Sequence, residues 1–93
     1  MRVATLRLEL VILECQSLRE KRRRMQAIIS KLRRHFNISV AEVDLHDWPA
    51  SAILGVAAVG NSRLEVRSVL DRVADALSVY PRAELVQHSI FEV

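Results

Sequence analysis

The residues best suited to chemistry in this chain are the arginines and lysines of one short segment, residues 19–34. Eight of the fourteen Lys and Arg lie there with a single acid, Glu20, so the segment carries +7 while the rest of the chain carries −4. Arginine suits phosphate because its planar guanidinium forms paired hydrogen bonds and stays charged. Dense charge of one sign also attracts polyanions, of which nucleic acid is the commonest in a cell. We therefore expect the segment to contact RNA or another polyanion.

These cations should lie on a helix. Ser17 and Glu20 have the spacing of a capping box, and apolar residues recur at helical spacing as far as Phe36. Asn37, which tolerates the left-handed backbone of a cap, should end the helix. Two cations, Lys21 and Arg22, border the apolar side and should extend along it to water. The other six face outward or flank that side and are the predicted phosphate contacts: Arg19, Arg23, Arg24, Lys31, Arg33 and Arg34.

The alternative for this helix is a solvated face, some of it paired with acids elsewhere in the chain, such as Asp71 and Asp75. Pairing would relieve the repulsion between like charges three and four residues apart. The sequence leaves both readings open.

A metal site, a reactive thiol and a phosphate-binding loop have weaker support in the sequence. Asp44, His46 and Asp47 precede Trp48, but a metal site needs at least three converging ligands, and Asp47 is better explained as a turn residue capping nearby N–H groups. Cys15 has no neighbouring His or second Cys, so we expect a free thiol, which suits a reducing cytoplasm. Two glycines cannot make a phosphate-binding loop. We expect no enzymatic activity, no cofactor and no metal.

Hydrophobic patterning predicts the elements that hold the basic helix. Alternation, apolar runs and a second capping box at Ser62 give six of them: a strand over 5–12, a helix from 18 to about 37, strands over 37–45 and 52–59, a helix from 63 that ends before Pro81, and a strand over 85–93. The apolar phase of the second strand changes between Val40 and Val43, which predicts a bulge or a late twist there. The order β-α-β-β-α-β predicts a single α+β domain over residues 1–93. It would have the ferredoxin-like fold, a four-stranded antiparallel sheet with two helices on one face.

The open face of this sheet should be partly apolar, with Val11 and small residues from 52–59. Such a face is commonly an association surface, so a homodimeric protein-interaction module without a nucleic-acid role is the alternative function. The central strand has no aromatic residue, so bases should not stack on the sheet as they do in RNA-recognition modules.

Three motifs, at residues 17–22, 37–44 and 54–61, together resemble the YlxP-like family of small bacterial proteins of unknown function. The resemblance implies a ferredoxin-like fold and a gene often placed beside that of ribosome-binding factor A. It implies no established activity and no catalytic residues. The family pattern of Asp, any residue, Trp, Gln and Arg after the second strand is broken here, because Pro49 and Ala50 follow Trp48.

The sequence thus predicts a non-enzymatic accessory protein of RNA or the ribosome, with a possible homodimer and no small-molecule substrate. The apolar N-terminal stretch is too short and too charged for a signal sequence or a membrane span, so we expect a cytoplasmic protein without membrane contact.

Overall fold

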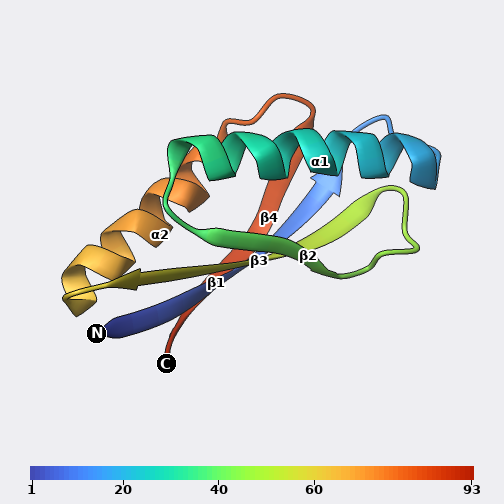
Figure 1. Ribbon diagram of the computed structural model, residues 1–93. Helices are drawn as coiled ribbons and strands as arrows, with labels where there is room; N and C mark the ends of the chain where they lie inside the picture. Colours follow the sequence, from blue (N-terminus) through green and yellow to red (C-terminus); the bar gives the residue numbers. More distant parts are fainter.

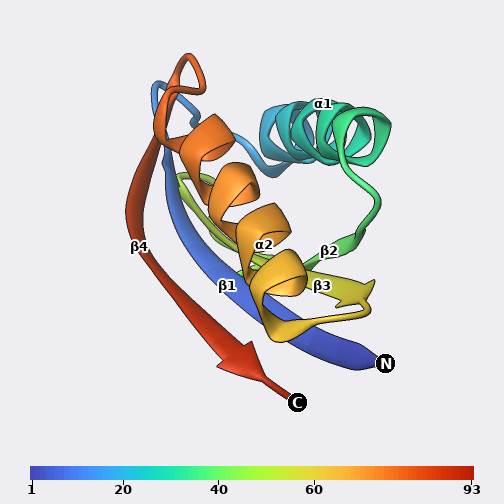
Figure 2. The ribbon, with the colours of Figure 1, turned by 90° about the vertical axis from the view of Figure 1, so that its left-hand side faces the viewer.

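A computed structural model describes residues 1–93 and contains all six predicted elements (Figure 1). In chain order they are β1 (Arg2–Ile12), α1 (Leu18–His35), β2 (Ser39–Asp44), β3 (Ser51–Gly60), α2 (Arg63–Ser78) and β4 (Ala83–Glu92). The strands form one antiparallel sheet in the order β2-β3-β1-β4. Both helices lie on the same face of this twisted sheet (Figure 2). The predicted ferredoxin-like fold is confirmed.

The two most apolar strands, β1 and β3, occupy the centre of the sheet and pair from Arg2 opposite Gly60 to Val11 opposite Ser51. Alternate residues of β1 point toward the helices, so its leucines are completely buried while Arg7 between them is exposed. β3 is covered on both faces over part of its length. Ile53, which pairs with Glu9 on the open face, is only 1% exposed.

Each helix begins where the sequence predicts. The hydroxyl of Ser17 accepts a hydrogen bond from the Glu20 N–H at 3.1 Å, and Ser62 does the same for Glu65 at 3.1 Å. α1 ends at His35, two residues before the predicted end at Asn37. The reason is that its cap, Phe36, already takes an extended backbone while its N–H still bonds the Leu32 carbonyl.

The edge strands differ from the predicted ones in length. β2 begins at Ser39, two residues after the predicted start, and β4 begins at Ala83, two residues before it. The predicted bulge in β2 is confirmed, since the register shifts between Glu42 and Asp44. The extra residue, Val43, lies across Gly55 of β3, where a Cβ atom would come within 2.8 Å of Val43 Cγ1. A larger residue at position 55 would therefore require the exposed Val43 side chain to shift.

Candidate nucleic-acid interface

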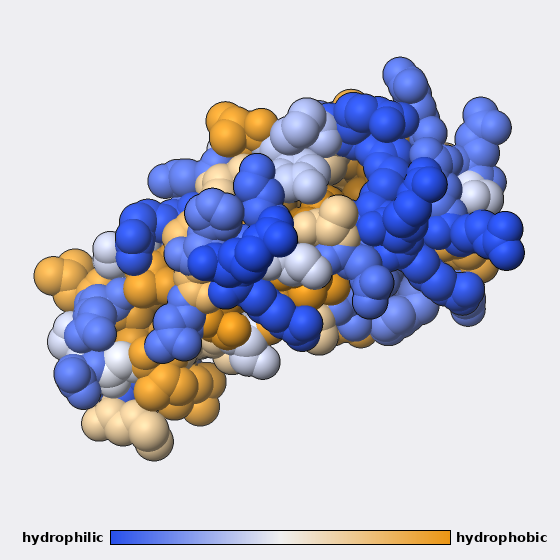
Figure 3. Space-filling view, turned by 45° about the horizontal axis from the view of Figure 1, so that its top comes forward, coloured by the Kyte–Doolittle hydropathy of each residue, from blue (hydrophilic) through white to orange (hydrophobic).

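The outward side of α1 is a row of cations in solvent. Four arginines are exposed there and make neither a hydrogen bond nor an ion pair within the chain: Arg19, Arg22, Arg23 and Arg34. Figure 3 shows hydrophilic side chains gathered at the end of the molecule where α1 begins. We call these four the free arginines. Arg22 was not among the predicted contacts, because on the helical wheel it borders the apolar side.

The free arginines form two groups along the helix. Arg19, Arg22 and Arg23 lie in its first two turns, and Arg34 lies in its last turn. From Arg23 to Arg34 the helix rises about 16 Å at 1.5 Å per residue. Since that separation is far larger than one phosphate, the surface suits an extended polyanion better than a single anion.

Arg24 has a different position from the one predicted. Its Nη1 donates to the Leu13 carbonyl and its Nη2 to the Arg82 carbonyl, both at 2.6 Å. These bonds join α1 to the loop after β1 and the loop before β4. Because both terminal nitrogens are engaged, Arg24 holds these loops together and is not a free phosphate donor.

Two other predicted contacts also have partners in the chain. The Arg33 Nη2 donates to the Val40 carbonyl at 3.1 Å, which joins the end of α1 to β2. The Lys31 ammonium lies 5.3 Å from the centre of the Tyr80 ring, a cation–π contact. Both side chains remain exposed, so they can still contribute charge to the surface.

Lys21 corrects the prediction that its ammonium reaches water. The residue is 1% exposed, and its Nζ lies 2.8 Å from Glu42 Oε2 and 2.5 Å from the Leu45 carbonyl oxygen. A buried ammonium is stable only when it is paired and hydrogen-bonded. Lys21 therefore belongs to the interior, where it ties α1 to β2 and the loop that follows.

The basic segment is not neutralised by the acids that might have paired with it. Neither Asp71 nor Asp75 forms an ion pair, and the single ion pair made by residues 19–34 is the one between Lys21 and Glu42. The expected pairing with these two acids is therefore absent, and this face of the helix is a solvated one. Its remaining charges are uncompensated.

The loop between β2 and β3 is built differently from the predicted turn. Asp44 Oδ1, not Asp47, accepts a backbone hydrogen bond, from the Leu45 N–H at 2.8 Å. His46 Nε2 lies 3.0 Å from the Glu42 carbonyl. No group of three His, Cys, Asp or Glu side chains is placed to hold a metal ion. Trp48, to which the sequence assigned no role, is 63% exposed in this loop.

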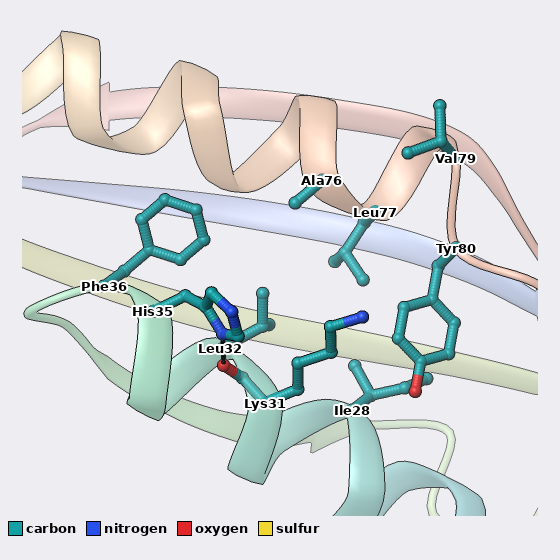
Figure 4. Close-up of a pocket in the computed structure, with 9 residues that line it drawn as sticks. All are labelled: Ile28, Lys31, Leu32, His35, Phe36, Ala76, Leu77, Val79 and Tyr80. Carbon is teal, nitrogen blue, oxygen red and sulfur yellow. Dashed lines mark hydrogen bonds between the residues drawn. The ribbon is translucent and has the colours of Figure 1, made fainter.

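A pocket of about 230 Å³ lies between the C-terminal ends of α1 and α2 (Figure 4). Its walls are mainly aliphatic and aromatic, including Leu32, Phe36, Leu77 and Tyr80, and the Lys31 side chain extends across it. None of the free arginines lines it. The pocket is therefore separate from the candidate phosphate surface.

Comparison with known proteins agrees with this fold. Residues 3–90 match the family described as "Protein of unknown function (DUF503)". The chain belongs to this family. It is also 32% identical over 76 residues to the uncharacterized protein YlxP of Bacillus subtilis (strain 168), an alignment covering 82% of this chain and 83% of that protein. The resemblance to the YlxP-like family is thereby confirmed for this DUF503 member.

Neither helix of this DUF503 protein is both long and apolar enough to cross a lipid bilayer.

Proposed function

We propose that this protein is a non-enzymatic accessory protein that binds RNA, on the ribosome or elsewhere, through the outward side of α1. The observation that carries the proposal is the set of free arginines, which are exposed and unpaired on one helix face. Holding uncompensated like charges three and four residues apart costs helix stability, and a bound polyanion removes that cost. The family resemblance implies a gene often placed beside that of ribosome-binding factor A. This gene neighbourhood is associative support for a role on the ribosome.

The contacts should be with phosphate groups, and sequence preference should be weak. The free arginines can each present paired donors to phosphate oxygens, which position a nucleic acid without reading it. The sheet offers little for base recognition, because its one aromatic residue, Phe91, lies on the edge strand β4. Affinity should therefore depend on salt much more than on sequence.

Binding of a fluorescein-labelled single-stranded RNA, followed by fluorescence anisotropy across a salt series, tests this function. With four phosphates neutralised, log K should fall against log salt with a slope of about −3. The test variant changes three free arginines together: Arg19→Glu, Arg23→Glu and Arg34→Glu. It should lose roughly a hundredfold or more in affinity at low salt.

A control variant with the same change in net charge separates a local contact from general attraction. It carries Arg2→Glu, Arg67→Glu and Arg72→Glu, which lie on β1 and α2. The proposal requires the α1 variant to lose far more affinity than this control. Equal losses in the two variants, or RNA binding by the α1 variant at the wild-type level, would show that α1 is not the interface.

A second function, from a different class, is self-association through the open face of the sheet. On this face Val59 and Phe91 are exposed, and Val43 lies over Gly55. Arg7 and Glu9 stand side by side on the central strand β1, and neither forms an ion pair within the chain.

This pair of charges favours a second copy of the chain as the partner. A two-fold axis crossing β1 between Arg7 and Glu9 would place each Arg7 opposite the Glu9 of the other copy. Two ion pairs would then form across the axis, one for each Arg7, and the apolar residues around them would be covered. In this function the open face binds another protomer and α1 has no part.

A further inference from the structure

Trp48 is the one tryptophan of the chain, and it is 63% exposed. Tryptophan is large and usually well covered in folded proteins, so an indole with most of its surface in water is unusual. An exposed aromatic ring beside cations is the combination with which proteins bind single-stranded nucleic acid, because every base has a face that can stack.

The loop that carries Trp48 is fastened to α1 through one oxygen atom. The Leu45 carbonyl accepts a hydrogen bond from Lys21 Nζ at 2.5 Å and another from the Trp48 backbone N–H at 3.1 Å. Leu45 itself has a left-handed backbone, with φ of 60°, which turns the chain so that its carbonyl can serve both donors. The turn from Leu45 to Trp48 is therefore tied to α1 through the Lys21 side chain.

Two of the free arginines at this end of α1, Arg22 and Arg23, lie near the strand that leads into the loop. Lys21, which holds the loop, is the neighbour of Arg22 in the sequence. Arg22 and Arg23 also share the lining of a shallow depression between α1 and β2 with Glu42, three residues before Leu45. In Figure 1 the loop between β2 and β3 lies next to the N-terminal end of α1.

We propose that Trp48 stacks on an unpaired base of a single-stranded RNA whose phosphates contact Arg19, Arg22 and Arg23. This inference rests on the proposed function and names its ligand class, a single strand with accessible bases. A stack on one indole adds affinity with little sequence preference, since it uses the face of the base and not its edge. It also explains how a ferredoxin-like protein without sheet aromatics can contact bases, from a loop and not from its sheet.

Because Trp48 is the sole tryptophan, its intrinsic fluorescence reports on stacking directly. Three probes of similar length separate base contacts from phosphate contacts: a single-stranded oligouridylate, an RNA duplex and inorganic polyphosphate, which has no bases. The single strand should quench the fluorescence on binding. Polyphosphate, and the duplex whose bases are already stacked, should bind through α1 and leave the fluorescence nearly unchanged.

Variants at Trp48 give the second readout. Trp48→Leu should weaken single-strand binding by roughly 5- to 100-fold and leave the salt slope and polyphosphate affinity as in the wild type. Trp48→Phe, which keeps an aromatic face, should recover much of that loss. The side chain is exposed, so both variants should fold, which circular dichroism would check.

The outcomes distinguish this inference from the proposed function. If the single strand binds with a steep salt dependence while the fluorescence does not change and Trp48→Leu binds like the wild type, stacking is wrong and the phosphate surface stands. If neither RNA nor polyphosphate binds at low salt, both are wrong. Equal quenching by polyphosphate would also overturn stacking, because that probe has no base to stack.

Discussion

The ammonium of Lys21 lies 2.8 Å from the carboxylate of Glu42, between the first turns of α1 and the end of β2. The two side chains are 1% and 17% exposed, so this is a nearly buried ion pair. It joins α1 to β2, the next element along the chain, and the Lys21 ammonium also bonds the loop that carries Trp48. The ion pair therefore lies in the interior of the fold and positions both parts of the proposed RNA surface, which are the start of α1 and the loop that carries Trp48.

Lys21→Met should destabilise the protein, because it leaves the Glu42 carboxylate without its partner in a mostly dry site. Removing one partner of a buried ion pair lowers the free energy of unfolding by at least about 3 kcal/mol. We expect a loss near this lower value because Glu42 keeps some contact with water. The free energy of unfolding, measured in urea, gives the value. The double variant Lys21→Met with Glu42→Leu should lie within about 1 kcal/mol of the wild type. A double variant as unstable as the single one would show that the charge left behind is not the cause.

Arg24→Gln should cost stability, whereas Arg23→Gln, one position earlier on the same helix, should not. The Arg24 guanidinium bonds two loop carbonyls, and a charge-assisted bond near the surface contributes about 1 kcal/mol. Arg23 has no such partner. In RNA binding the order should reverse, with Arg23→Gln weakening the affinity more. Thermal unfolding and anisotropy on the same two proteins check both halves.

Arg7→Glu and Glu9→Arg test self-association through the open face. Each variant alone should be monomeric in sedimentation equilibrium, because two like charges would face each other across the two-fold axis. An equimolar mixture should form a heterodimer, since the protomer with two acids on β1 then faces the protomer with two arginines. A wild-type protein that stays monomeric at high micromolar concentration, or a dimer unaffected by either change, would argue against this arrangement.

Ser17→Ala should lower the free energy of unfolding by about 1 kcal/mol, because the Glu20 N–H loses its capping oxygen. Ser62→Ala should do the same at the start of α2. A loss of similar size in both variants would show that the two helix starts contribute alike. No change in either would mean that water satisfies these N–H groups equally well.

Local patterns in the sequence were enough to predict the fold. The alternation of β1, the apolar run of β3 and the two capping boxes each depend on neighbouring residues, and the structure bears them out. Helix and strand ends differ from the predicted ones by one to three residues, the largest difference being the start of β1 at Arg2. At Phe36, for example, the extended backbone began before the asparagine that was expected to cap the helix.

The amino-acid sequence by itself determined that one amphipathic helix would concentrate positive charge on a ferredoxin-like domain. Only the tertiary structure decided which of those charges are available. Lys21 and Arg24 look like their neighbours in the sequence, yet one meets Glu42 and the other meets two loop carbonyls brought by distant segments. The position of the loop that carries Trp48 was decided in the same way, by a Leu45 carbonyl that only folding places next to Lys21. Whether a charge or an aromatic ring is free or engaged depends on the residues of other elements that lie near it in space. Helical periodicity in the sequence describes only the residues of one helix.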